Sequence, residues 1–206
     1  MKPSVFGGTL AFLIGLIPSA AAAGQFVVSP NVAHEINLTT DSSPGWVPTA
    51  DQRLRALVTV QAYLDAIEDG RYDDAYGLFS DLLKGDQTLA QFKQEEQKFK
   101  ALAGPLKIWK VLKVTWTKDP AQAPSPGIYV AIDIAGQFVN VDRDCGYIVL
   151  YQSLPGGDLT VMRREQGFLE NAIARQIEAK QSKAEVVKAW AKLSGYCPNY
   201  DPSLAP

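Results

Sequence analysis

Histidine and cysteine, which often carry acid–base or nucleophilic chemistry, are scarce in this chain. It has one histidine, His34, and two cysteines, Cys145 and Cys197. His34 precedes the region that we expect to fold as a domain, so a His-based dyad or triad would need this segment to fold back. Two distant cysteines and one histidine do not supply the ligand cluster of a zinc site. The sequence also lacks a phosphate-binding glycine loop and a Gly-x-Ser-x-Gly motif. We therefore predict no metal, no cofactor and no assigned catalytic residue.

Two charged residues lie on stripes that are otherwise apolar, and these are the first ligand-binding candidates. Glu96 is in helical register with Phe92 and Phe99. Lys110 is in strand register with Ile108, Leu112 and Val114. A buried charge is costly unless it is paired, so such residues are candidates for function. Three structural alternatives stay open: Lys110 extends to solvent at the sheet edge, Glu96 lies at the margin of its stripe, or the two form a salt bridge.

Tyrosines of the predicted sheet are the second set of candidates. Tyr147 and Tyr151, together with Tyr129, could line a pocket between the sheet and the helices. Equally, their rings could serve only in packing.

The N-terminal residues 1–23 have the pattern of a cleavable signal peptide. Lys2 precedes an apolar run, and Ala21 and Ala23 form a small-residue cleavage site that would leave Gly24 first. The alternative, a membrane-spanning helix, needs about 20 apolar residues, and this run is shorter and is interrupted by glycines. With no cysteine near the cut to carry a lipid, we expect a protein of the periplasm or a secreted one, with no membrane span after cleavage.

Export bears on the two cysteines, because oxidising compartments permit disulfides. Cys145 lies in a predicted strand and Cys197 in the C-terminal tail, 52 positions later. We predict a disulfide between them. The alternative is one buried apolar cysteine and one free thiol.

The remaining pattern predicts an α+β domain with flanking segments. Residues 24–50 are rich in proline and short polar residues, a composition that predicts an extended arm. Residues 51–168 form the domain: three N-terminal helices packed on a curved four-stranded antiparallel sheet, with strands expected over residues 106–117, 128–138, 145–154 and 159–166. Residues 169–206 form a C-terminal helical extension and a proline-rich tail.

Three stretches of the predicted domain carry a resemblance to a known family. They are residues 63–76 (YLDAIEDGRYDDAY), 99–106 (FKALAGPL) and 126–130 (PGIYV). Together with the order of elements they resemble the exported bacterial family called domain of unknown function 4019, within the nuclear transport factor 2-like, or cystatin-like, superfold. The resemblance implies an architecture and an exported location, but no reaction. Two features depart from it: the last strand reads LTVMRR instead of carrying a Trp-Arg pattern, and the added C-terminal helix could cover a sheet edge or a pocket mouth.

Composition leaves two classes of function. With 20 basic and 22 acidic residues the net charge is −2, which gives no electrostatic reason to bind nucleic acid. The first hypothesis is an exported, non-catalytic module that binds a small apolar ligand or a protein partner. The alternative is a small acid/base enzyme, isomerase- or hydrolase-like, that uses a cavity carboxylate and a tyrosine. We also predict a homodimer formed through the outer sheet face, on which Trp109, Val111 and Tyr129 are expected.

Overall fold

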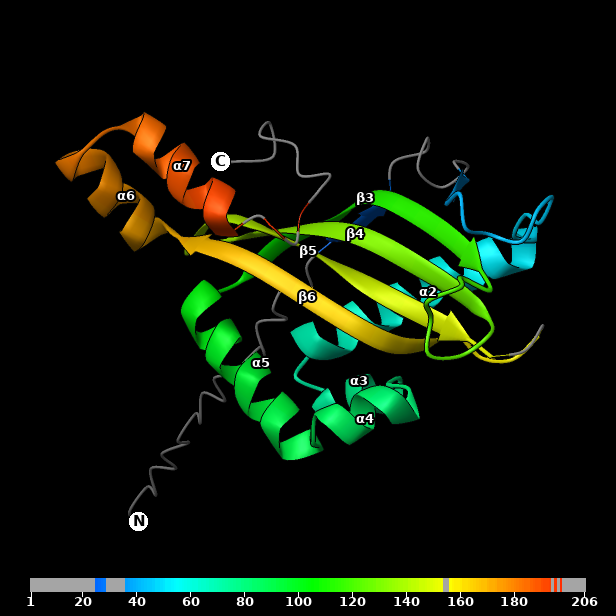
Figure 1. Ribbon diagram of the computed structural model, residues 1–206. Coiled ribbons are helices and arrows are strands. Elements are labelled where there is room, and N and C mark those ends of the chain that lie inside the picture. The colour runs from blue at the N-terminus through cyan, green and yellow to red at the C-terminus, as the bar shows by residue number, and fades with distance from the viewer. Residues whose placement is uncertain (1–24, 29–35, 154–155, 194, 196, 198–206) are drawn as a thin grey trace, which may run out of the picture.

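The structure is a computed structural model that describes residues 25–28, 36–153, 156–193, 195 and 197. It has two helical layers, one on each face of a single sheet (Figure 1). The predicted signal peptide, residues 1–23, and His34 lie outside the described residues.

Four helices precede the main strands, and local signals set their ends. They are α2 (Ala50–Glu68), α3 (Tyr72–Gly77), α4 (Asp81–Asp86) and α5 (Leu89–Ala103). Thr49 and Gln52 form a capping box at the start of α2, and Thr88 and Gln91 form another at the start of α5. Gly104 ends α5 with a φ of 70°, in the left-handed region that favours glycine.

The sheet has six strands in the described part of the chain, in the order β1-β3-β4-β5-β6, with β2 also paired to β3. The strands β3 to β6 form an antiparallel meander. The two short strands before α2 both run parallel to β3. The bounds are β1 (Gln25–Val28), β2 (Asn37–Leu38), β3 (Leu106–Lys118), β4 (Ile128–Phe138), β5 (Val141–Gln152) and β6 (Thr160–Glu170).

These elements confirm the α+β class and correct its details. Four helices, not three, come before the meander, because α3 and α4 are separated at Phe79 and do not form one continuous helix. The backbone of Ser80 donates to Val161 O at 2.8 Å, and Val161 donates to Leu78 O at 2.8 Å, so the chain pairs with β6 at this point. The sheet has six strands, not four, and the C-terminal extension has two helices, α6 (Asn171–Lys180) and α7 (Lys183–Leu193), not one.

The register of β3 also differs from the prediction. An irregularity in its pairing lies between Val111 and Lys113, and it reverses which face the side chains occupy. Trp109 and Val111 therefore lie in the main core, 8 % and 3 % exposed, and not on the outer face where we expected them. Leu112 packs on the opposite face against the C-terminal helices. Lys110 consequently does not share a face with Val114. The predicted dimer surface also loses Trp109 and Val111, because both are buried in the main core.

The main core lies between the sheet and the helices α2 to α5, whereas a smaller core lies on the other sheet face beneath α6 and α7 (Figure 1). None of the described helices combines the length and apolar character that a membrane crossing needs.

Candidate functional site

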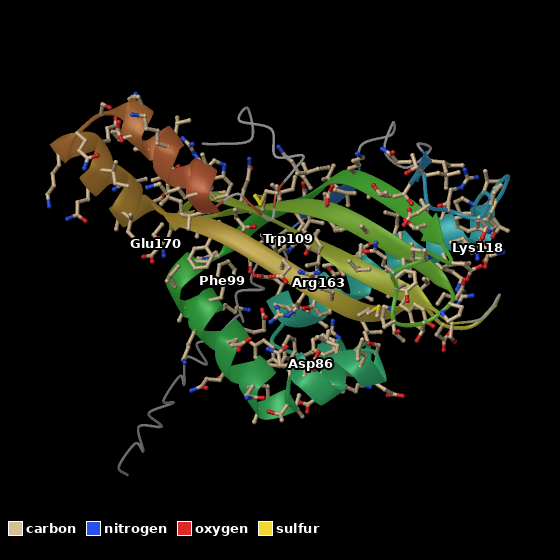
Figure 2. All side chains as sticks on the ribbon, viewed as in Figure 1. Asp86, Phe99, Trp109, Lys118, Arg163 and Glu170 are labelled. Carbon is tan, nitrogen blue, oxygen red and sulfur yellow. A yellow bond between two sulfur atoms is a disulfide. The ribbon has the colours of Figure 1, made fainter. Side chains whose placement is uncertain are left out.

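A cavity of about 400 Å³ lies between the inner face of the sheet and the helices α2, α4 and α5. Its volume falls within the range of small-molecule sites. Side chains fill the rest of this layer (Figure 2), where the Phe99 ring packs edge-on against Phe138 and Phe168, with ring centres 5.2 and 5.1 Å apart. The apolar lining comprises Leu64, Ile67, Leu83, Phe99, Trp109, Ile134, Phe138, Ile148 and Phe168.

One polar part of the lining is the ion pair between Glu96 of α5 and Arg164 of β6. The guanidinium of Arg164 donates to Glu96 Oε1, and its other terminal nitrogen lies 3.6 Å from a Glu95 carboxylate oxygen. It also lies 5.0 Å from the centre of the Phe92 ring, so three groups hold its position. Burial raises the pKa of Glu96, while the charge and hydrogen bond of Arg164 act in the opposite direction.

Tyr63 of α2 adds a hydroxyl group to the same lining. Its side chain is 2 % exposed, and its hydroxyl lies near the Arg164 guanidinium but makes no hydrogen bond of good geometry within the described residues. Burial raises the pKa of Tyr63 above its usual range, so the hydroxyl keeps its proton. A buried hydroxyl without a partner is costly, and a polar atom of a ligand in the cavity would supply the missing partner.

Asp144 of β5 is the second buried carboxyl group of the cavity. It is 2 % exposed, and its oxygens accept hydrogen bonds from Gly136 N at 3.0 Å and Gln166 Nε2 at 2.5 Å. Both donors are neutral, and no described cation pairs with it. Burial therefore raises the pKa of Asp144 to about 7.

A glycine makes room for this contact. A Cβ atom at Gly136 would lie 2.5 Å from the Phe138 ring and 2.8 Å from the Trp109 ring. The regular pairing of β4 with β5 ends at Ile134 and Gly146. The Asp144 side chain thus binds a backbone N–H just beyond the ladder.

The sequence-predicted residues divide between this cavity and other places. Glu96 and Tyr147 are among the lining residues. The Tyr147 ring, however, packs with the Arg163 guanidinium 5.6 Å from its centre, and strand alternation puts it on the face of Cys145. Lys110 and Tyr151 are not part of the lining. Lys110 is half-buried opposite Ala135, and the Tyr151 hydroxyl donates to Pro126 O at 2.8 Å.

The three polar lining residues on which the site depends most, Tyr63, Asp144 and Arg164, were not among the candidates predicted from the sequence. Asp144 alternates with Gly146 and Ile148 on the inner face of β5, and this alternation was the available signal. Arg164 belongs to the atypical last strand LTVMRR and stands opposite Ile148. Tyr63 belongs to the stretch 63–76, which carries the family resemblance but no separate signal for a site.

The predicted disulfide between Cys145 and Cys197 is present. It joins β5 to the segment after α7, on the sheet face opposite the cavity. Cys145 is fully buried there, and Ala174, Val186 and Trp190 of the two C-terminal helices pack in the same cluster. The extension therefore covers the outer sheet face near β5 and β6.

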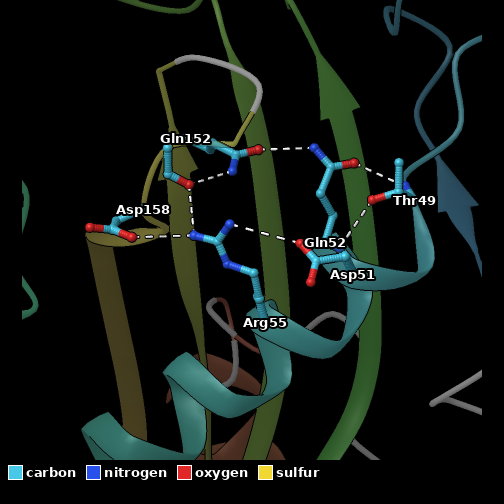
Figure 3. A network of polar contacts seen from close by, with 7 residues as sticks. Thr49, Asp51, Gln52, Arg55, Gln152 and Asp158 are labelled. Carbon is cyan, nitrogen blue, oxygen red and sulfur yellow. Dashed lines mark hydrogen bonds and ion pairs between the residues drawn. The ribbon is translucent and has the colours of Figure 1, made fainter.

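A separate polar network fixes α2 to the β5–β6 hairpin (Figure 3). Gln52 donates to Gln152 Oε1 at 2.9 Å, and Gln152 donates in turn to Gly157 O at 2.6 Å. Arg55 donates to the same carbonyl at 2.8 Å and pairs with Asp158 at 3.3 Å. The network thus holds the helix that carries Tyr63 against the sheet. Among the described residues no group of three or more His, Cys, Asp or Glu side chains could hold a metal ion.

Comparison with protein families identifies the region that contains most of the cavity. Residues 59–156 match the family described as protein of unknown function (DUF4019). This segment is a DUF4019 domain. It supplies Tyr63, Glu96 and Asp144, whereas Arg164, the C-terminal helices and Cys197 follow the matched part of the chain. A search of the curated proteins gave no match, and a search of the solved structures gave none either.

Proposed function

We propose that the protein is an exported binding module that holds a small, mainly apolar molecule in the cavity between the sheet and α2, α4 and α5. The observation that carries this proposal is a mainly apolar cavity of about 400 Å³ in whose lining the Tyr63 hydroxyl, although near Arg164, makes no hydrogen bond of good geometry within the described residues. A mainly apolar ligand that carries polar groups would fill the volume and give the Tyr63 hydroxyl a hydrogen-bond partner. The nuclear transport factor 2-like superfold is part of the same proposal, because helices lie against the concave side of an antiparallel meander.

Native mass spectrometry tests whether the cavity retains a ligand. Protein purified from the exported fraction should carry an additional mass that is lost on denaturation. Ile67→Trp, which adds bulk to the lining, should abolish this mass. Leu54→Trp serves as the matched control, because Leu54 lies on the same helix but is 63 % exposed and does not line the cavity. Retention of the same molecule by Ile67→Trp would overturn the assignment to this cavity.

Export is tested separately. The signal-peptide pattern predicts that the mature chain begins at Gly24, after cleavage behind Ala23. N-terminal sequencing of protein from the exported fraction should therefore start at Gly24. A chain that still begins with Met1 there would refute cleavage.

An acid/base enzyme is the second candidate, and one observation favours it. Asp144 has a pKa of about 7 and lines the same cavity as the protonated hydroxyl of Tyr63. A carboxyl group with a pKa near the working pH suits proton transfer. Glu96, the carboxylate expected from the sequence, is less suited because Arg164 is bound to it. Turnover of a molecule identified by mass spectrometry, abolished in Asp144→Asn, would favour this candidate over the binding module.

A further inference from the structure

The lining of the cavity contains more acidic than basic residues. Two basic residues, Lys100 and Arg164, belong to the lining, and both are engaged. Lys100 donates to the backbone carbonyl of Glu68, and Arg164 is paired with Glu96. Five acidic residues belong to the lining: Glu68, Glu95, Glu96, Asp144 and Glu165.

Asp144 differs from the other four acidic residues in its position and its partners. It is 2 % exposed and receives hydrogen bonds from one amide side chain and one backbone N–H. Charging a buried carboxyl group is costly unless a cation lies nearby. No described residue provides that cation, so the ionised form of Asp144 lacks a counter-ion in a cavity with room for one.

A second, independent feature indicates a ligand in the same cavity. The Tyr63 hydroxyl is buried and, although Arg164 lies near it, makes no hydrogen bond of good geometry within the described residues. It belongs to the end of the cavity near Arg164, which stands opposite Ile148 in the sheet. Asp144 lies four residues from Ile148, or about 13 Å along β5. Apolar rings, including those of Phe99 and Phe138, line the cavity as well.

We propose that the cavity binds an apolar molecule that carries a basic nitrogen, with its cationic group paired to Asp144. This inference rests on the proposed function and adds the chemical class of the ligand. The cation supplies the counter-ion that Asp144 lacks, and the acidic excess of the lining favours it. A carboxylate or phosphate at the same position would face Asp144 without a free cation to offset the repulsion. The other charged residues of the lining are Glu68 of α2, Glu95, Glu96 and Lys100 of α5, and Arg164 and Glu165 of β6. Glu165 is paired with Arg163 at 3.1 Å.

Three probes with the same ring and different head groups test the proposal by calorimetry. They are 1-naphthylmethylamine, a cation; 1-naphthylmethanol, which is neutral; and 1-naphthoate, an anion. At about pH 8, above the Asp144 pKa of about 7, we expect the amine to bind at least about tenfold more tightly than the alcohol, and the anion most weakly. Lowering the pH to about 5 should weaken binding of the amine, because Asp144 gains a proton, and leave the alcohol unchanged.

Asp144→Asn should remove the preference for the amine while keeping affinity for the alcohol. Asp142→Asn is the matched control, because Asp142 belongs to the same strand but pairs with Arg143 at 3.0 Å and does not line the cavity. The pH comparison uses the wild-type protein and stays decisive if Asp144→Asn fails to fold. Binding of the alcohol as tightly as the amine at about pH 8 would overturn the amine assignment and leave the binding module intact. Failure of all three probes to bind would overturn the amine assignment. Native mass spectrometry would then test separately whether the cavity holds a ligand.

Discussion

Arg164 of β6 and Glu96 of α5 are joined by an ion pair across the wall of the cavity, although 68 positions separate them in the chain. The Glu96 side chain is 7 % exposed and that of Arg164 is 22 % exposed. The pair thus connects the last strand to the last helix before the antiparallel meander. The sequence had suggested Lys110 of β3 as the partner of Glu96, but Lys110 takes no part in this ion pair.

Replacement of Glu96 should lower stability more than it alters binding. In Glu96→Gln the amide keeps the shape of the side chain but leaves the Arg164 charge with Glu95 alone, at 3.6 Å. Because the pair is only partly shielded from solvent, we expect the free energy of unfolding to fall by about 1–3 kcal/mol. Urea unfolding measures the change. Glu95→Gln is the control, with an expected loss below about 0.5 kcal/mol since Glu95 is exposed. Equal losses in the two variants would contradict the role given to Glu96.

The disulfide should stabilise mainly the C-terminal extension. Thiol labelling of the denatured, unreduced protein is expected to find no free thiol, because Cys145 and Cys197 are joined. In the chain-entropy model, closing a loop of 52 positions raises the free energy of unfolding by about 4 kcal/mol. After reduction, hydrogen exchange should accelerate first in α6 and α7, which pack around the bridge, and least in α2 and α5. Uniform acceleration in all four helices would show that the bridge stabilises the whole domain instead.

The hairpin network should be sensitive to loss of Gln152. This side chain is 1 % exposed and accepts a hydrogen bond from Gln52. Gln152→Leu leaves the buried amide of Gln52 without its acceptor, so we expect unfolding to become easier by about 1–3 kcal/mol. Gln61→Leu, an exposed position on α2, should change stability by less than about 0.5 kcal/mol. Thermal melting of the two variants compares them, and a Gln152→Leu protein as stable as wild type would argue against the network.

Local signals in the sequence are enough to locate several helix ends. Thr49 and Thr88 begin α2 and α5, and Gly104 ends α5, because capping depends on residues only a few positions apart. The antiparallel meander and the disulfide were also predicted. These features follow from short-range patterns or from the scarcity of cysteine.

Long-range pairing explains what the sequence did not reveal. The break at Phe79 depends on hydrogen bonds with Val161 of β6, and the two parallel strands before α2 depend on β3. A single irregularity after Val111 changed the face assigned to Trp109, since alternation alone carries no information about bulges. The candidate site shifted for the same reason: the partner of Glu96 comes from a strand whose register only the assembled sheet defines.

Asp144 should make the stability of the protein depend on pH in a predictable direction. Burial raises its pKa from 3.8 to about 7 in the folded state. Between about pH 4 and about pH 7 the folded protein keeps a proton that the unfolded chain releases, so stability falls as the pH rises through this window. The stabilisation is complete below about pH 4 and is lost above about pH 7. Its size is on the order of a few kcal/mol.

Asp144→Asn isolates this contribution, because the amide does not titrate. The asparagine oxygen can still accept from Gly136 N, and its amino group can donate to Gln166 after the Gln166 amide turns over. We therefore expect the free energy of unfolding of the variant, relative to wild type, to increase from about pH 4 to about pH 7. Urea unfolding at several pH values measures both proteins, with Asp142→Asn as the control that should follow wild type. Curves for Asp144→Asn and wild type that run parallel through this window would show that Asp144 is ionised in the folded protein. Its carboxylate would then already have the compensation that we assign to a cationic ligand.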